Sequence, residues 1–199
     1  MIVDEAIQFF SEVGFEGQTR ALAHRLGVTQ PLLYRYFPDK DALIERVFSE
    51  VLTSSWDATW EQLLSDRSRP LIDRIIDFYT RYTDSTFRHE RVRLLMFASL
   101  RDHDTASRYL GFVRAHLFVP LVREFRAGAG LPDDAPITEE ELECVAGLHG
   151  AIGYVVACRS MKSGAAPSNA RDLVAQQVGI FLNGAANALS ALQARSAAP

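Results

Sequence analysis

The chain has 199 residues, of which 48% are hydrophobic and 23% are charged. These proportions suit one or two compact domains and exclude an intrinsically disordered chain. No run comes near the roughly 18 uninterrupted apolar residues of a membrane-spanning helix, and the first residues lack the basic and apolar regions of a signal peptide. We therefore expect a cytoplasmic protein. The net charge of −4 gives no support for nucleic-acid binding by itself, because the usual sign of that function is a basic patch.

The pattern of apolar residues predicts an all-α fold. Apolar side chains recur at spacings of three and four, and no stretch alternates with a period of two. The first helix is expected from near Val3 to Val13, with Gly14 at its C-terminal end. About nine helices follow from the turn signals along the chain. We place an N-terminal three-helix domain at 1–48 and a larger helical domain at 49–199.

The segment 18–37 has the spacing of a helix-turn-helix. Ala23 is small enough for two helices to approach, and Gly27, four residues later, tolerates the positive φ of the turn. Leu33 would lock the second helix onto the first. Thr29 is a suitable N-cap, and Pro31 is tolerated in a first helical turn. The alternative interpretation is an ordinary helical hairpin with an amphipathic surface.

The second of these short helices would expose side chains that suit DNA. Its outer face carries Gln30, Pro31, Tyr34 and Arg35, whose amide, apolar, phenol and guanidinium groups suit base edges, thymine methyls and phosphates. The local charge also fits, because the segment 18–40 has a balance of +3. That balance comes from Arg20, Arg25, Arg35 and Lys40 against Asp39.

At these residues the sequence resembles the tetracycline-repressor (TetR) family of bacterial regulators. The matching elements are the helix ending in Gly14-Phe15, then Leu22-Ala23, Leu26-Gly27-Val28, Leu33-Tyr34-x-Tyr36-Phe37 and Lys40-Asp41-x-Leu43. The resemblance implies a homodimer with a small DNA-binding domain and a larger domain that binds an effector and dimerises. Two features depart from the family pattern. The sequence starts at Met1 without the basic arm that commonly precedes the first helix, so either the arm is absent or the true start lies upstream, and Gly17-Gln18 replaces the usual Ser or Thr cap of the second helix.

The resemblance also implies roles for individual residues in binding double-stranded operator DNA. Gln30 and Pro31 would touch bases, Tyr34 and Tyr36 would contact phosphate and base edges, and Lys40 would grip phosphate. Thr19 and Arg20 fall where family members add further contacts. The complete set of expected DNA-binding residues is Thr19, Arg20, Thr29, Gln30, Pro31, Tyr34, Arg35, Tyr36 and Lys40.

A fourth helix is expected to begin at Asp39 as N-cap and to connect the two domains, reaching Val51 or Trp56. Turn-forming residues then divide the chain into five more helices. One of these contains Pro120, which should kink it near His116. The next starts with a capping box formed by Thr138 and Glu141.

The last two helices are candidates for a dimer interface. The helix after Thr138 is apolar on two faces, with glycines between them, so that both faces must be covered. We expect a four-helix interface between two copies, and the alternative is that both helices fill a monomeric core. The expected interface residues are Gly147, Ala151, Val155, Val178, Phe181 and Ala185.

The middle of the chain is dense in aromatic residues, and a subset could line an effector pocket. The candidate pocket residues are Trp56, Trp60, Phe78, Tyr82, Phe97, Phe112, His116 and His149. The alternative is that most of these aromatic side chains are core and that each histidine is structural.

Metal and redox chemistry find no support in the sequence. Cys144 and Cys158 lie 14 positions apart in one expected helix, about 21 Å along its axis, which is too far for a disulfide. We interpret both as small buried hydrophobic residues. The histidines and cysteines form no close ligand pair such as HxxxH or CxxC. We expect no metal and no cofactor.

Three classes of function were weighed. The sequence favours a transcriptional regulator, specifically a repressor that a small hydrophobic effector releases from its operator, with activation left open. The alternative is a ligand-binding sensor or interaction protein of the same fold with weak or no operator binding. An enzyme is not supported, because the chain has no nucleophile elbow, phosphate loop or metal cluster.

Overall fold

The fold is known from a computed structural model of the whole chain. The backbone is described for residues 1–53, 56–86, 89–101, 103–163 and 169–196. Within these ranges the side chains of 52–53, 86, 89, 99–101, 103–106, 160–163 and 185–196 are outside the description. The described backbone contains helices and turns and no strand, which confirms the all-α prediction.

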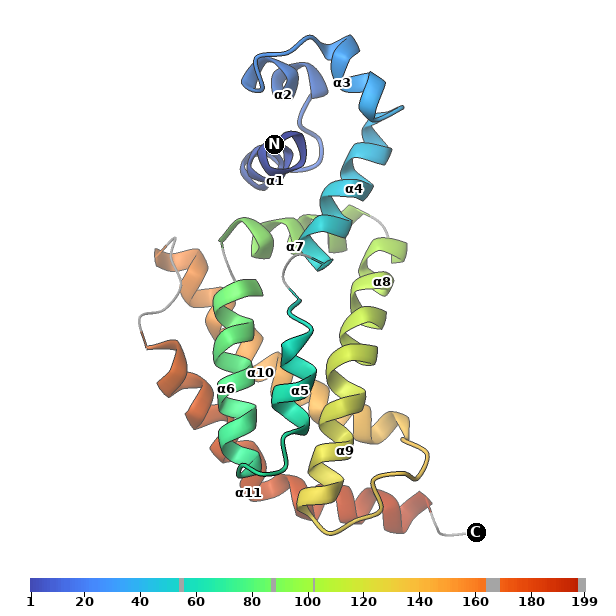
Figure 1. Cartoon of the computed structure of the whole chain (residues 1–199), viewed down its shortest axis with the longest axis vertical. Coiled ribbons are helices and arrows are strands. Elements are labelled where there is room, and N and C mark those ends of the chain that lie inside the picture. The colour runs from blue at the N-terminus through green and yellow to red at the C-terminus, as the bar shows by residue number, and fades with distance from the viewer. Residues whose placement is uncertain (54–55, 87–88, 102, 164–168, 197–199) are drawn as a thin grey trace.

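The helices follow one another with short connections (Figure 1). They are α1 Ile2–Val13, α2 Thr19–Arg25, α3 Gln30–Tyr36, α4 Lys40–Thr53, α5 Thr59–Ser65, α6 Leu71–Thr86, α7 His89–Arg101, α8 His103–Val113, the π-helical turn η1 Arg114–Phe118, α9 Val119–Gly128, α10 Glu139–Ser163 and α11 Ala170–Ser196.

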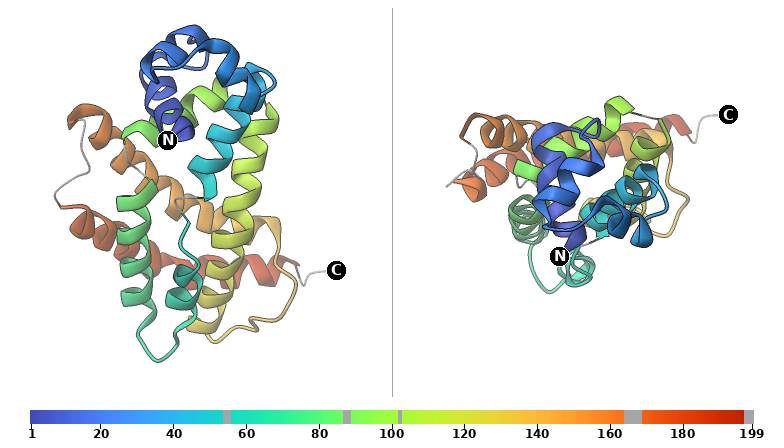
Figure 2. Two further views of the ribbon diagram at one scale, coloured as in Figure 1. Left: turned by 45° about the horizontal axis from the view of Figure 1, so that its top comes forward. Right: turned by 90° about the horizontal axis from the view of Figure 1, so that it is seen from above.

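The elongated molecule carries α1, α2 and α3 at one end, with α4 descending from them (Figure 1). Helix α7 lies across the molecule beneath α1. Below it, α5, α6, α8 and α9 run along the long axis, and α10 and α11 cross behind them. Figure 2 shows the same arrangement from two further directions and sets α2 and α3 at the tip, away from α11.

The helices enclose two clusters of buried apolar side chains. The first joins α1, α2, α3 and α4 and includes Leu94 and Ala98 of α7. Gly14 ends α1 with φ of 79°. It lies against the ring of Phe97, which, like Leu94 and Ala98, belongs to α7. Arg93 adds hydrogen bonds to the carbonyls of Ser11 (2.5 Å) and Glu12 (3.3 Å) at the end of α1. Helix α7 is therefore fastened to the N-terminal helices, while the proposed boundary after residue 48 stays a prediction.

The second cluster fills the rest of the molecule, from α5, α6 and α9 to the inner faces of α10 and α11. Helix α10 would pass as a membrane span by length and composition between Glu139 and Arg159, where mean hydropathy is 1.2. However, 44% of that window is buried, and Leu142, Val145 and Leu148 belong to the core cluster. Core helices of soluble proteins pass the same test.

Two elements differ from the predicted layout. Helix α4 ends at Thr53, and a separate short helix, α5, begins at Thr59, whose amide N–H and hydroxyl both donate to a carboxylate oxygen of Asp57 at 2.8 Å. These hydrogen bonds precede a new helix where the sequence indicated at most an extension to Trp56. The predicted helix through Pro120 is interrupted by η1, in which the N–H of Val119 bonds to the carbonyl of Arg114. The missing proline N–H is thus accommodated by a π-bulge one residue earlier.

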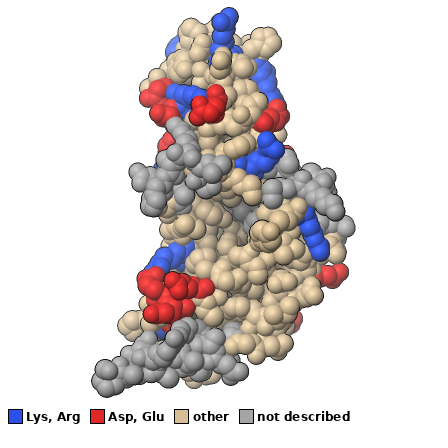
Figure 3. Space-filling view, turned by 180° about the vertical axis from the view of Figure 1, so that it is seen from behind, with Lys and Arg blue, Asp and Glu red and all other residues tan. Residues whose placement is uncertain are grey.

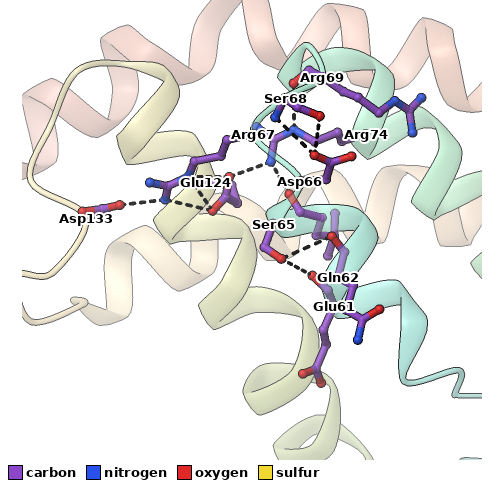
Figure 4. A network of polar contacts seen from close by, with 11 residues as sticks. Glu61, Gln62, Ser65, Asp66, Arg67, Ser68, Arg69, Arg74, Glu124 and Asp133 are labelled. Atoms are coloured by element: carbon purple, nitrogen blue, oxygen red, sulfur yellow. Dashed lines mark hydrogen bonds and ion pairs between the residues drawn. The ribbon is translucent and has the colours of Figure 1, made fainter.

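Charged side chains are buried where α9 meets its neighbours. Arg126, with a 2% exposed side chain, makes two hydrogen bonds to the carboxylate of Glu141, which is fully buried. Glu141 also accepts from the N–H of Thr138, so the predicted capping box is confirmed. Nearby, Glu124 accepts from Arg67 and Arg74, and Arg67 reaches Asp133 as well (Figure 4).

Candidate nucleic-acid interface

The turn between α2 and α3 is built as the sequence predicted. Gly27 has φ of 69°, which favours glycine. Thr29 caps α3, because its hydroxyl accepts a hydrogen bond from the N–H of Leu32 at 3.4 Å, and Pro31 lies in the first turn. Ala23 and Leu33 are 2% and 1% exposed, so the two short helices are locked together by buried contacts.

A polar network joins the start of α2 to α3. The hydroxyl oxygens of Thr19 and Tyr34 lie 2.9 Å apart, and the amide nitrogen of Gln30 donates to the hydroxyl of Thr19 at 3.0 Å. Thr19 is only 6% exposed. It therefore lies beneath the surface that the sequence assigned to DNA contact and holds two of the other predicted contacts.

The remaining predicted contacts lie at or near the surface of the same end of the molecule. Tyr36 is 65% exposed and Tyr34 is 37% exposed. Arg20, Thr29, Pro31 and Arg35 are exposed, whereas Gln30 and Lys40 are half-buried. All nine predicted DNA-binding residues thus come together on α2, on α3 or at the start of α4, although DNA contact itself stays a prediction.

Arg25 takes a different role from the other cations of this segment. It forms hydrogen-bonded ion pairs with Glu5 and Glu12 of α1, with Nη1 of Arg25 2.5 Å from Glu12. Its guanidinium lowers the pKa of the Glu12 carboxyl through hydrogen bonding. The +3 balance counted from the sequence therefore includes one cation already held by two carboxylates, and Arg20, Arg35 and Lys40 are the others.

The N-terminal region matches a known family. The model for "Bacterial regulatory proteins, tetR family" matches residues 2–47, which include α1, α2, α3 and the first half of α4. Residues 2–47 are thus similar to the N-terminal region of the TetR family.

Curated bacterial regulators are similar to parts of the chain. The tetracycline repressor protein class C of Escherichia coli is 43% identical over 53 residues, covering 26% of this chain and 24% of the relative. The class D repressor of Escherichia coli is 26% identical over 125 residues, covering 59% and 54%. The HTH-type transcriptional regulator BetI of Burkholderia cenocepacia is 31% identical over 70 residues, covering 35% and 36%. The chain thus spans between about a quarter and about half the length of these relatives.

A solved structure shares the fold over most of the chain. The crystal structure of a putative TetR-family transcriptional regulator from Mesorhizobium loti aligns with a TM-score of 0.61 and 16% identity, covering 92% of this chain and 93% of the other. At this identity the likeness shows the TetR-family fold and nothing finer.

Seven of the eight candidate pocket residues come together. The ring of Trp56 has its centroid 5.3 to 6.4 Å from the rings of Trp60, Phe78, Tyr82, Phe112 and His116. His149 joins this aromatic cluster through Tyr82, at 5.5 Å. Phe97 does not, because it packs 6.4 Å from Phe15 in the N-terminal cluster.

Two buried polar atoms, one in the aromatic cluster and one beside it, have no hydrogen-bond partner among the described residues. These are the hydroxyl of Tyr79 and Nδ1 of His149. Burial lowers the pKa of His149 to about 4 and raises that of the Tyr79 phenol. His116 differs, because its Nδ1 lies 3.0 Å from a carboxylate oxygen of Glu61 near the surface. Effector binding by these residues stays a prediction.

A cavity of about 400 Å³ lies elsewhere, between α4, α7, α8 and α10. None of the candidate pocket residues lines it. Its lining residues are Phe48, Val92, Leu95, Met96, Ala98, Tyr109, Leu110, Gly153, Tyr154 and Ala157. We call this the junction groove. Sequence reasoning missed it because its walls come from four helices that are distant in the chain and share no motif.

The candidate dimer-interface residues are divided between the two sides of α10 and α11. Gly147 and Ala151 are exposed, and Val155 is half-buried. Val178 is fully buried in the core, because this side of α11 faces α6 and α10. A place for Val178 in an interface is therefore not supported. Phe181 packs 5.2 Å from Phe125. The side chain of Ala185 lies outside the described residues.

Proposed function

We propose that this protein is a sequence-specific DNA-binding transcriptional regulator whose α3 enters the major groove of operator DNA. The observation that carries the proposal is the exposed face of α3. Pro31, Tyr34, Arg35 and Tyr36 lie outward on a helix that Gly27 and the Leu33 contact hold in one orientation. Such a face supplies apolar, phenol and guanidinium groups to base edges and phosphates. A regulator of this kind works in the cytoplasm, and nothing in the proposed site calls for enzymatic chemistry.

We propose further that the protein acts as a homodimer through α10 and α11. Tyr154 and Ile180 on these helices are 73% and 63% exposed, and a Cβ added at Gly147 or Gly150 would meet open space. Figure 3 shows the face over these helices, where uncharged side chains predominate and charged ones gather toward the edges. A two-fold pair would present two copies of α3 to successive major grooves, about 34 to 36 Å apart.

Selection from random double-stranded DNA tests this function. The purified protein should enrich a palindromic sequence whose half-sites lie about 10 base pairs apart or at a multiple of that spacing. Enrichment of no sequence would contradict the proposal and favour a sensor that does not read DNA.

We infer that the regulator is a repressor and that its effector is a small uncharged hydrophobic molecule bound in the junction groove. No residue lining the groove is charged, and desolvation raises the pKa of the half-buried Tyr109 phenol, which so stays neutral. The groove volume is in the range of small-molecule sites. Met96 and Leu110, which line it, are 43% and 58% exposed, so a ligand that covers them gains hydrophobic free energy.

The position of the junction groove suits regulation. Phe48 of α4 and Ala98 of α7 line it and also belong to the N-terminal core cluster. An ion pair between Arg108 and Glu45 joins α8 to α4 on the same side. An effector that binds better when α4 and α7 are displaced would shift the population away from the DNA-binding arrangement.

The fluorescence of the neutral probe N-phenyl-1-naphthylamine tests the site. Ala157→Phe should fill the groove and abolish the rise in probe fluorescence, whereas His149→Phe should leave it unchanged. The opposite pattern would place the site in the aromatic cluster, as the sequence predicted. Probe binding to both variants would contradict a site at either place.

A further inference from the structure

The polar network at the start of α2 centres on the hydroxyl of Thr19. The Gln30 amide nitrogen can only donate, so the hydroxyl of Thr19 accepts from it at 3.0 Å. The hydroxyl oxygens of Thr19 and Tyr34 lie 2.9 Å apart, and either of them can be the donor. The Thr19 hydroxyl therefore holds both Gln30 and Tyr34.

This network limits what the two outer side chains offer to DNA. The Gln30 amide has two N–H groups, and one of them is used by Thr19. Its carbonyl oxygen and second N–H remain, and this is the pair that forms the bidentate contact with the N6 and N7 edge of adenine. The Tyr34 hydroxyl, on a side chain 37% exposed, is held by Thr19 where it can meet a phosphate.

We propose that Thr19 is a positioning residue that sets the base preference of Gln30 and the phosphate contact of Tyr34 without touching DNA itself. The proposal rests on the proposed function, since it assumes that α3 reads bases. Thr19 is 6% exposed and lies on α2, so its hydroxyl is held in place by the packing of the two short helices. Without that hydroxyl, the Gln30 amide can rotate and lose its fixed pattern of donor and acceptor.

The test compares Thr19→Val with Thr19→Ser on the duplex selected by the wild-type protein. Valine keeps the shape of threonine and removes the hydroxyl, whereas serine keeps the hydroxyl. A bidentate contact gives roughly 5- to 150-fold discrimination against a wrong base. We expect Thr19→Val to lose most of the discrimination at one adenine per half-site, and Thr19→Ser to retain it. The salt dependence of binding should be the same in both variants, because no charge is removed.

Two further variants separate a positioning role from a general loss of folding. Gln30→Ala should abolish the same adenine preference, and adding Thr19→Val to it should cause no further loss. Tyr34→Phe should weaken binding to every duplex by a similar factor and leave the adenine preference intact. Thermal unfolding of Thr19→Val shows whether the fold is kept, and Thr19→Ser carries the test if it is not.

The possible failures are distinguishable. If the wild-type protein has no sequence preference, both the proposed function and the role of Thr19 are wrong. If the wild-type protein prefers a sequence and Thr19→Val keeps that preference unchanged, only the role of Thr19 is wrong. If Thr19→Ser fails as Thr19→Val does, the methyl group matters rather than the hydroxyl, and the proposal is again wrong.

Discussion

Two connections between consecutive helices show opposite uses of polar side chains. At the turn between α2 and α3, the Thr19 hydroxyl bonds to both Gln30 and Tyr34 at the edge of the molecule, and these outer groups keep unused hydrogen-bonding capacity. At the connection between α9 and α10, Arg126 and Glu141 are buried, and the Arg126 guanidinium also donates to the carbonyls of Ala135 (2.7 Å) and Pro136 (2.9 Å).

The difference separates polar groups that recognise a partner from polar groups that fix the chain. A buried ion pair whose hydrogen bonds are all made has no donor or acceptor free for a partner. Removing one of its two residues leaves the charge of the other unpaired. A network at the surface is organised by one buried hydroxyl and can exchange water for DNA. The predictions that follow test this contrast in order of expected size.

The largest effect is expected from Arg126→Leu. The substitution leaves the carboxylate of Glu141 buried without a cation and should lower the free energy of unfolding by about 3 to 5 kcal/mol. Urea denaturation followed by circular dichroism measures it. Arg123→Leu, at an exposed position of the same helix, is the matched control and should change stability by less than about 0.5 kcal/mol. Equal effects at the two positions would show that the buried pair has no special role.

The next effect is a pH dependence from His149. Burial lowers its pKa to about 4, whereas the unfolded chain has the ordinary value near 6.5. The unfolded state therefore binds more protons between these values. The contribution of the neutral His149 side chain to the free energy of unfolding is therefore complete above pH 6.5. It is lost as the pH falls toward 4, by roughly 3 kcal/mol in total. His149→Phe should remove this component from unfolding midpoints measured across that range, and an unchanged pH profile would contradict the buried neutral imidazole.

Smaller changes in the free energy of unfolding, of opposite sign, are expected when two glycines are replaced by alanine. Gly27 has a positive φ and open space around it, so Gly27→Ala should cost about 1 to 2 kcal/mol through backbone conformation alone. Gly111 lies within α8, also facing open space, and Gly111→Ala should stabilise by about 0.5 to 1 kcal/mol. Thermal unfolding compares the two variants. A gain at Gly27 would show that the turn does not need its glycine.

The sequence predicted the N-terminal helices residue by residue because their signals are local. The positive φ of Gly27, the cap of Thr29 and the buried contact of Leu33 each depend on a few neighbouring residues. The capping box of Thr138 and Glu141 was predictable for the same reason. What the sequence did not show there was the burial of Thr19, which depends on how closely α2 and α3 pack.

The remaining features depend on contacts between distant residues. Arg126 meets Glu141 across a connection, Arg25 meets Glu5 and Glu12 of another helix, and the junction groove has walls from four helices. The aromatic cluster formed largely as predicted, yet Phe97 packs against the N-terminal helices because α7 lies across both parts of the molecule. Periodicity gives the buried side of a helix but not its neighbour, which is why these features were missed.

The most direct measurement of the central claim is a salt titration of DNA binding by fluorescence anisotropy, with Gln30→Ala and Lys40→Ala compared on the selected duplex and on a random one. If α3 reads bases and the start of α4 grips phosphate, Lys40→Ala weakens binding to both duplexes and lowers the salt slope by about 1. Gln30→Ala then weakens binding to the selected duplex alone and leaves the slope unchanged. If both variants bind both duplexes with the affinity and salt slope of the wild-type protein, the account is contradicted.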